Sequence, residues 1–479
     1  MKTSDRIDAA RRRQLRAAAA SGLALAWPGP SWAREATLEA SLRERVARDG
    51  VGFAAVQVGP TGMVWHTAGS LRHGSPDPVT RRTLFELGSL TKAFVALLLA
   101  DAVLGGRASF DDPVEAALPG GQTLRDTNGE PLRLIDLATH RSGLPRMPAN
   151  LSPKELSNPY PSYGEARLLA FLREWKAEVP RGNRFEYSNL GYGLLAQVLA
   201  WREGTTLDSL LARRIFQPLG LTDLHIRRPL PAGDDLAAVG AALGASLARA
   251  PREATGHDGQ RKPLPAWQFG VLAGAIGLVG SIEPIGRFIE AALGLFDHPL
   301  KEAFALCLQQ RTEGDHPLHP FGLAWELSPI WSREQPRLLF NQDGATAGFS
   351  SSLWIEPARR RGAAVLANAF IETRELALQA MDPALTSAAF SLPPLPGELI
   401  APLVGHWQLD TRFALDIRAR DGRLWVRPTD QPEFELLPRN PRHFYVREAT
   451  LQLRFDEAPT PASLLVLRDG KGMLFRRRN

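Results

Sequence analysis

The segment Gly88-Ser89-Leu90-Thr91-Lys92 lies where a short apolar stretch, residues 83–87, gives way to a long one, residues 90–104. The first stretch has the length of a strand. The second has the length of a helix and stops at a pair of glycines. This helix is apolar nearly all round, and such helices are normally buried. A lysine at the start of a buried helix either destabilises the fold or has a chemical role. The segment therefore predicts a reactive turn packed against the core.

Ser89 is expected at the N-terminus of this helix, where free backbone N–H groups and the positive dipole end favour developing negative charge. Lys92 is three residues on, so both side chains share one face. A serine hydroxyl needs a base to become a nucleophile, and a desolvated lysine can serve. The alternative is a capping serine beside a solvated lysine, since roughly one Ser-x-x-Lys match is expected by chance in a chain of this length.

The composition bounds the class of protein. A chain of 479 residues allows two or three domains, and 23% charged with 44% hydrophobic residues is ordinary for a soluble globular protein. The net charge of +6 is scattered, with no basic stripe interleaved with aromatics, which argues against nucleic-acid binding. The single cysteine, Cys307, excludes an intrachain disulfide and a thiolate metal site, and its apolar neighbours predict a buried, inert thiol.

Residues 1–33 have the pattern of an export signal. Arg11-Arg12-Arg13 forms a basic region, residues 17–26 form a short apolar stretch, and Ser31-Trp32-Ala33 forms a small-x-small cleavage site. The paired arginines indicate the twin-arginine route. The apolar stretch is too short for a membrane anchor. We therefore expect a periplasmic or secreted protein with no stable membrane insertion after cleavage.

Residues 34–388 are predicted to form one α+β domain. Strand patterns occur at both ends, and residues 110–300 between them are mostly helical, so distant segments should close one sheet. The expected strands cover residues 51–58, 62–67, 321–325, 335–341, 347–356 and 362–369.

A proline-rich linker, residues 389–399, separates this domain from residues 400–479. Short alternating runs with Asp-Gly turns predict a small antiparallel sheet or barrel there. The expected strands cover residues 413–418, 424–426, 434–437, 444–446, 451–455, 464–467 and 473–475.

Three further segments accompany the Ser89 turn: residues 137–145, Tyr187-Ser188-Asn189, and residues 342–349. Together these motifs resemble the serine hydrolases related to class C β-lactamases and low-molecular-weight penicillin-binding proteins, in order and spacing, over about residues 40–385. The resemblance implies the β-lactamase/transpeptidase-like fold, an antiparallel sheet flanked by helices plus a helical subdomain. The chain after residue 400 is similar to the small β domain often appended to such hydrolases.

The resemblance also implies roles. Ser89 would be acylated, Lys92 would assist its deprotonation, and Tyr187, poised by nearby cations, would pass a proton to the leaving group. Asn189 would hydrogen-bond the substrate. The backbone N–H groups of Ser89 and Ala345, beside Gly344, would form the oxyanion hole. No metal or organic cofactor is needed. His140 falls in a loop that the family uses structurally, and His316 and His319 are not expected to hold a metal.

The third motif departs from the family pattern, because it opens with Gln342 where lysine or histidine is usual. A neutral amide would lower the pKa of Tyr187 less than a lysine and hold a substrate carboxylate more weakly. We therefore expect weak β-lactam turnover and an ester, peptide or peptidoglycan-like substrate. The alternatives are a true β-lactamase or D-alanyl-D-alanine carboxypeptidase, and a non-catalytic penicillin-recognising sensor or wall-binding protein. The sequence does not fix the oligomeric state.

Overall fold

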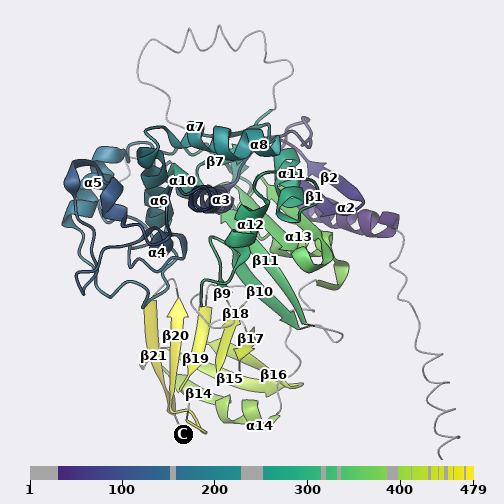
Figure 1. Ribbon diagram of the computed structural model, residues 1–479. Helices are drawn as coiled ribbons and strands as arrows, with labels where there is room; N and C mark the ends of the chain where they lie inside the picture. The colour runs from purple at the N-terminus through teal and green to yellow at the C-terminus, as the bar shows by residue number, and fades with distance from the viewer. Residues whose placement is uncertain are drawn as a thin grey trace, which may run out of the picture.

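The fold was taken from a computed structural model, which describes most of the chain from Ser31 to Arg478. The described ranges are residues 31–151, 158–227, 252–313, 320–331, 336–385, 397–411, 413–429, 433–440, 442–446, 451–456, 458–468 and 471–478. They form an α+β domain and a C-terminal β-barrel (Figure 1). Residues 1–30, residues 389–396 of the predicted linker 389–399, and His316 with His319 lie outside these ranges, so the predictions made for them stay predictions. The last linker residues, 397–399, belong to a short helical turn.

An eight-stranded antiparallel sheet in the order β2-β1-β13-β12-β11-β10-β9-β8 organises the first domain. The early hairpin of β1 and β2 pairs with the late strand β13, so distant segments close one sheet as expected. The strands are β1 (Gly52–Gly59), β2 (Gly62–Gly69), β8 (Thr312–Glu313), β9 (Pro320–Phe321), β10 (Glu326–Trp331), β11 (Pro336–Ala345), β12 (Ser350–Glu356) and β13 (Arg361–Ala367).

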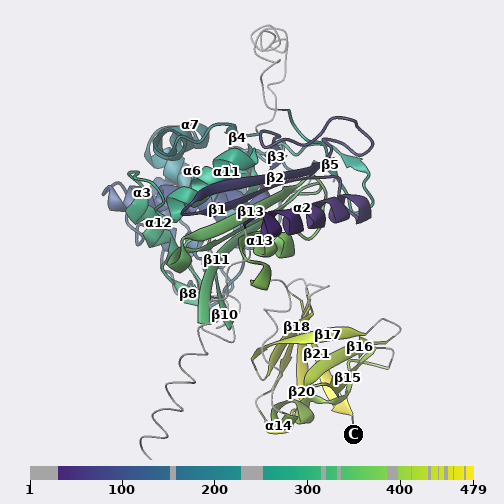
Figure 2. The same ribbon diagram turned by 90° about the vertical axis from the view of Figure 1, so that its right-hand side faces the viewer.

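Helices cover both faces of this sheet (Figure 2). On one face α2 (Ser31–Arg48) and α13 (Arg374–Met381) pack over a small core that includes Leu42, Phe53 and Trp354. The other face carries the main core, which includes α3 (Thr91–Leu104), α11 (Ile282–Ala292) and α12 (Lys301–Leu308). The remaining helical elements extend this side as a subdomain. They include α4 (Leu134–Ala138), α5 (Glu165–Glu174), α6 (Asn189–Arg202), α7 (Leu207–Leu211), α8 (Gln217–Leu219) and α10 (Ala273–Ile276).

A short three-stranded sheet precedes the reactive turn. It has the order β3-β7-β4, with β3 (Phe85–Glu86), β7 (Leu278–Gly280) and β4 (Leu224–Ile226). The expected strand at residues 83–87 is therefore shorter than the sequence suggested. A minor hairpin joins β5 (Gly256–His257) to β6 (Pro263–Leu264).

The C-terminal strands close into an eight-stranded barrel around an apolar interior that includes Trp407, Phe455 and Phe475. Short helical turns, α14 (Gly397–Ile400) and residues 401–403, lead into it. The seven expected strands are present, and β14 was missed. The strands are β14 (Gly405–Gln408), β15 (Ala414–Arg420), β16 (Arg423–Pro428), β17 (Phe434–Asn440), β18 (His443–Val446), β19 (Leu451–Phe455), β20 (Ser463–Arg468) and β21 (Lys471–Arg478).

One strand prediction was wrong in part. The run at residues 321–325 is a strand only to Phe321, and the chain then turns with Ala324 at φ +65° before β10 starts. The helix expected at residues 90–104 is α3, and Cys307 is buried on α12 as expected. Among the described residues, no helix combines the length and apolar character required to cross a membrane.

Candidate active site

Ser89 lies in a single 3-10 turn, Gly88–Leu90, which leads directly into α3. Gly88 has φ +54°, and a Cβ built there would lie 2.6 Å from the backbone N of Ala345. Only glycine accepts both this conformation and this approach. Thr91 Oγ1 donates to the Gly88 carbonyl at 2.7 Å and accepts from Leu278 N at 3.0 Å, which fixes the turn. Ser89 remains partly exposed on this rigid turn.

The Lys92 side chain is fully buried directly behind Ser89. Its Nζ lies 2.9 Å from Ser89 Oγ, 2.8 Å from Asn189 Oδ1 and 3.0 Å from the carbonyl oxygen of Ala275. These contacts come from α3, α6 and α10, so three helices hold the amine. The alternative of a solvated lysine is wrong.

The surroundings of Lys92 favour the neutral amine. Burial lowers its pKa well below the ordinary value, and the positive charge of Arg146 lowers it further. A neutral amine has two N–H donors and one lone pair. The Asn189 and Ala275 oxygens can only accept, so in a neutral amine they would take both donors and leave the lone pair for Ser89 Oγ. The 2.9 Å contact with Ser89 Oγ is compatible with Lys92 acting as a base.

Tyr187 and Asn189 are brought to the site by the start of α6. Ser188 caps this helix, because its Oγ accepts from Gly191 N at 2.8 Å, and the same hydroxyl donates to the Pro145 carbonyl at 2.7 Å. His140 Nδ1 accepts from Ser188 N at 3.0 Å. The predicted motifs at residues 137–145 and 187–189 are therefore tied together in space.

His140 supports the tyrosine rather than the serine. Its ring packs on the Tyr187 ring with centroids 4.3 Å apart, and its backbone has φ +59°. Burial lowers the pKa of His140 well below its ordinary value. With Nδ1 engaged by the Ser188 backbone N–H, the neutral ring carries its proton on Nε2 and has no free base to offer.

Tyr187 lies within hydrogen-bonding reach of both Ser89 and Gln342. Gln342 Nε2 donates to the phenol oxygen at 3.3 Å. Burial raises the pKa of Tyr187, and the hydrogen bonds and the Arg146 charge offset this only in part. We expected nearby cations to lower the pKa of this phenol, but burial has the larger effect and raises it.

Strand β11 forms the wall opposite Tyr187. A Cβ at Gly344 would lie 2.2 Å from the Leu87 carbonyl oxygen and 3.0 Å from Ser89 N, so glycine lets the strand lie against the reactive turn. Ser351 Oγ, on β12, donates to the same Leu87 carbonyl at 2.9 Å. The backbones of Ser89 and Ala345 thus meet at the mouth of the site, with Ala345 exposed.

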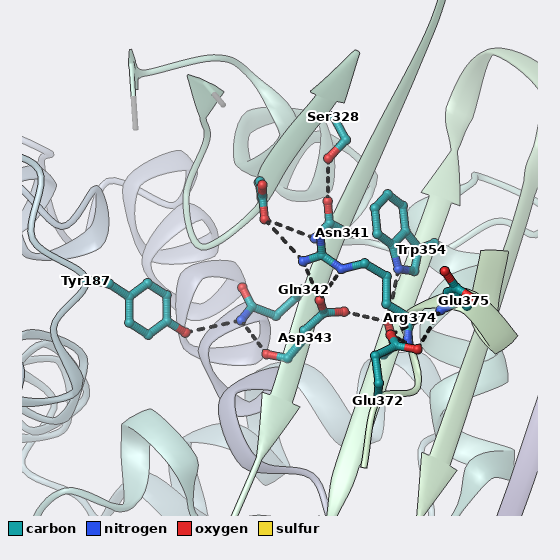
Figure 3. A network of polar contacts seen from close by, with 11 residues as sticks. Tyr187, Ser328, Asn341, Gln342, Asp343, Trp354, Glu372, Arg374 and Glu375 are labelled. Carbon is teal, nitrogen blue, oxygen red and sulfur yellow. Dashed lines mark hydrogen bonds and ion pairs between the residues drawn. The ribbon is translucent and has the colours of Figure 1, made fainter. Parts of the chain in front are cut away.

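The residue after Gln342 is an acid in a polar network (Figure 3). Asp343 accepts from Arg374 Nε at 2.8 Å, from Arg374 Nη2 at 2.6 Å, and from Ser352 Oγ at 2.5 Å. Glu326 lies 3.9 Å from the same guanidinium. Gln342 points the other way, toward Tyr187. This wall thus presents the neutral amide of Gln342 and the carboxylate of Asp343, which is already paired with Arg374.

All the candidate residues named from the sequence converge on one site. They are Ser89, Lys92, Tyr187, Asn189, Gln342, Gly344 and Ala345. Sequence reasoning missed three contributors: the carbonyl of Ala275, which leaves no side-chain signal, and the charges of Arg146 and Arg374. Arg146 follows directly after the motif at residues 137–145, and that position was a usable clue.

The family comparison agrees with this geometry. A family model described as Beta-lactamase matches residues 38–386. Since this match covers most of the chain, the protein belongs to the β-lactamase family, and it is a serine hydrolase with that fold.

Individual relatives are similar at low identity. A β-lactamase from Pseudomonas fluorescens is 24% identical over 349 residues, which cover 67% of this chain and 88% of that protein. The D-alanyl-D-alanine-carboxypeptidase/endopeptidase AmpH of Escherichia coli K12 is 28% identical over 172 residues, which cover 36% of this chain and 44% of AmpH. The solved structure of a class C β-lactamase from Rhodobacter sphaeroides superposes with a TM-score of 0.57 at 26% identity, covering 74% of this chain and 98% of that one.

Proposed function

We propose that this protein cleaves an ester or amide through an acyl-enzyme on Ser89. The observation that carries the proposal is the Lys92 amine, buried and 2.9 Å from Ser89 Oγ, with its two other contacts taken by oxygen acceptors. In the first step the Ser89 proton passes to Lys92 Nζ while Oγ attacks the substrate carbonyl carbon. The resulting oxyanion is stabilised by the backbone N–H groups of Ser89 and Ala345, beside Gly344.

Collapse of this intermediate expels the leaving group, which takes a proton from Tyr187. Water then attacks the acyl carbon and gives a proton to the Tyr187 phenolate. The Ser89 oxygen leaves and takes its proton back from Lys92 Nζ, which frees the acid and restores all three side chains. Asn189 holds Lys92 through Oδ1 and offers Nδ2 to the substrate. No metal or organic cofactor has a part in these steps.

The substrate class is proposed from the β11 wall. Gln342 is neutral, and Asp343 already pairs with Arg374, so the described residues of this wall offer no unpaired cation for a substrate carboxylate. We favour an ester or a peptide-like amide without a carboxylate on the leaving group, and weak β-lactam turnover. The second candidate, a β-lactamase or D-alanyl-D-alanine carboxypeptidase, is favoured by the names of the relatives.

The test is a substrate panel run with Ser89→Ala as the control. p-Nitrophenyl esters, nitrocefin and D-Ala-D-Ala peptides are compared by kcat/KM, with intact-mass spectra taken during turnover. We expect ester cleavage that is lost in Ser89→Ala, and nitrocefin turnover below that of ordinary β-lactamases. A lasting adduct without product would favour the sensor, and fast nitrocefin clearance would favour the second candidate. Ester cleavage that survives Ser89→Ala would remove the assignment.

We further propose that residues 1–33 direct export to the periplasm or beyond and that the mature chain acts there on a small or peptidoglycan-like substrate. The basic, apolar and small-residue regions in this stretch support the proposal. N-terminal sequencing of protein from a periplasmic fraction should begin at Arg34. A full-length chain retained in the cytoplasm would contradict it.

A further inference from the structure

Arg146 places a positive charge at the mouth of the active site. It is exposed, and its Cζ lies 5.4 Å from the centroid of the Tyr187 ring. Arg374, near the opposite wall, is held by Asp343, whereas Arg146 makes no ion pair with any residue that the structure describes. A guanidinium in this position has donors available for a ligand.

The backbone that carries Arg146 is fixed relative to the site. Its carbonyl accepts from Asn189 N at 3.0 Å and from Leu190 N at 3.2 Å, at the start of α6. On one side Pro145 is held by Ser188 Oγ, and on the other Met147 Sδ lies 3.6 Å from Asn189 Nδ2. The backbone of Arg146 is therefore fixed to the same corner of the site as Asn189.

The two walls of the site differ in charge. The β11 wall carries the carboxylates of Asp343 and Glu326 around the guanidinium of Arg374. The opposite wall is formed by the loop that follows residues 137–145, and it carries Arg146. A substrate anion is repelled at the first wall and attracted at the second, because the site interior screens charges less than water does.

We propose that Arg146 binds a carboxylate on the acyl part of the substrate. The proposal rests on the proposed function, in which Asn189 offers Nδ2 to the substrate. We take that contact to be with the acyl chain, and Arg146 adjoins Asn189 through its backbone. It names the substrate as a half-ester or half-amide of a dicarboxylic acid, or an acyl chain of equivalent charge. The Arg146 charge also lowers the pKa of Lys92 and of His140, which shows that its field reaches the buried part of the site.

The experiment uses a matched pair of esters in the full chain. p-Nitrophenyl hydrogen adipate carries a free carboxylate on the acyl chain, and p-nitrophenyl methyl adipate carries a neutral ester in its place. The measured quantity is the ratio of kcat/KM for the anionic ester to that for the neutral one, corrected for spontaneous hydrolysis. Using the ratio cancels any change that a variant makes to the chemical step itself.

We expect this ratio to fall about tenfold in Arg146→Gln. This is the effect of losing one charge-assisted hydrogen bond, reduced because Arg146 is exposed to solvent. Arg146→Lys should keep most of the ratio, and added salt should lower the wild-type ratio. Arg184→Gln is the matched control. Arg184 is an exposed arginine three residues before Tyr187, and it already forms an ion pair with Glu186. Its removal should leave the ratio unchanged. An unchanged ratio in Arg146→Gln would overturn the proposal.

A binding measurement separates failure of this proposal from failure of the proposed function. Monomethyl adipate is titrated calorimetrically into Ser89→Ala and into Ser89→Ala with Arg146→Gln, which requires no turnover. Weaker binding by about tenfold in the double variant supports the Arg146 site even if no ester is cleaved. Equal affinity, or no binding to either variant, rejects it even if Ser89 proves to be the nucleophile.

Discussion

Replacing Lys92 by methionine tests the proposed base directly. Methionine keeps the length and apolar stem of lysine but removes the amine that lies 2.9 Å from Ser89 Oγ. General-base assistance contributes about 10²–10⁴-fold to such steps, so acylation should slow by that factor, or about 3–5 kcal/mol. The fold should persist, because the side chain is enclosed by packed helices and methionine fits irregular apolar space.

The same variant has a stability signature. Removing Nζ leaves the oxygens of Asn189 and Ala275 each without a donor, at about 1 kcal/mol apiece. An opposing term is the desolvation of the Lys92 amine, which costs the wild type free energy on folding and is absent in Lys92→Met. Because the pKa of Lys92 is lowered in the folded protein, the unfolded chain binds more protons between that folded pKa and about 10.4. Wild-type stability relative to Lys92→Met should therefore rise with pH across this window, by at most about 1.4 kcal/mol per pH unit.

The activity assay is the rate of Ser89 acylation by a p-nitrophenyl ester in stopped flow, followed across pH. In the wild type this rate should rise as pH passes the folded pKa of Lys92, since only the neutral amine accepts a proton. Lys176→Met, at an exposed lysine, is the matched control and should behave as wild type. Acylation of Lys92→Met within tenfold of wild type, with the same pH profile, would refute the reasoning.

Three further predictions concern the walls of the site. Tyr187→Phe should slow cleavage of an alkyl ester about 10²–10⁴-fold but a p-nitrophenyl ester much less, since p-nitrophenolate leaves without a proton; equal losses in kcat would contradict the shuttle role. Gly344→Ala should destabilise by about 1–3 kcal/mol in thermal unfolding, because its Cβ would lie 2.2 Å from a backbone oxygen, whereas Gly59→Ala meets nothing and should be neutral. Gln342 Nε2 lies 3.3 Å from the Tyr187 phenol oxygen, so Gln342→Lys should place a cation there and raise nitrocefin turnover about tenfold. No gain would show that Gln342 is not the reason for weak β-lactam turnover.

The sequence predicted the local parts of this site better than the long-range ones. The buried helix after Ser89 follows from its unbroken apolar run, and the face shared with Lys92 follows from helix geometry. The approach of Tyr187 and Asn189 came from the resemblance, because no spacing rule joins residues about a hundred positions apart. The contact between Lys92 and the Ala275 carbonyl was invisible, since a backbone oxygen has no sequence signature.

Other errors have the same physical origin. The strand at β3 is only two residues long because the chain turns into the 3-10 segment at Gly88, earlier than the apolar pattern suggested. β14 was missed because Gly405–Gln408 offers a single buried apolar residue, Trp407, and is paired by strands on both sides. The runs of β15 and β16 were readable because these strands bury alternate residues such as Leu415 and Ile417.

The charge arrangement around the site also needed three dimensions. Asp343 is near Arg374 only because the last residues of β11 lie beside the first residue of α13 in the folded chain. The sequence shows that Gln342 replaces a usual cation. It does not show that Arg374 is already paired with Asp343 or that Arg146 lies over the Tyr187 ring. This division is the basis for expecting substrates whose charge lies on the acyl side.

The central claim, that Ser89 carries the acyl group, is tested most directly by mass spectrometry of protein quenched during turnover of a p-nitrophenyl ester. Peptide mapping should place the mass of one acyl group on the peptide containing Ser89, and Ser89→Ala should carry none. An acyl group on any other residue, or turnover with no adduct and no dependence on Ser89, would contradict the account.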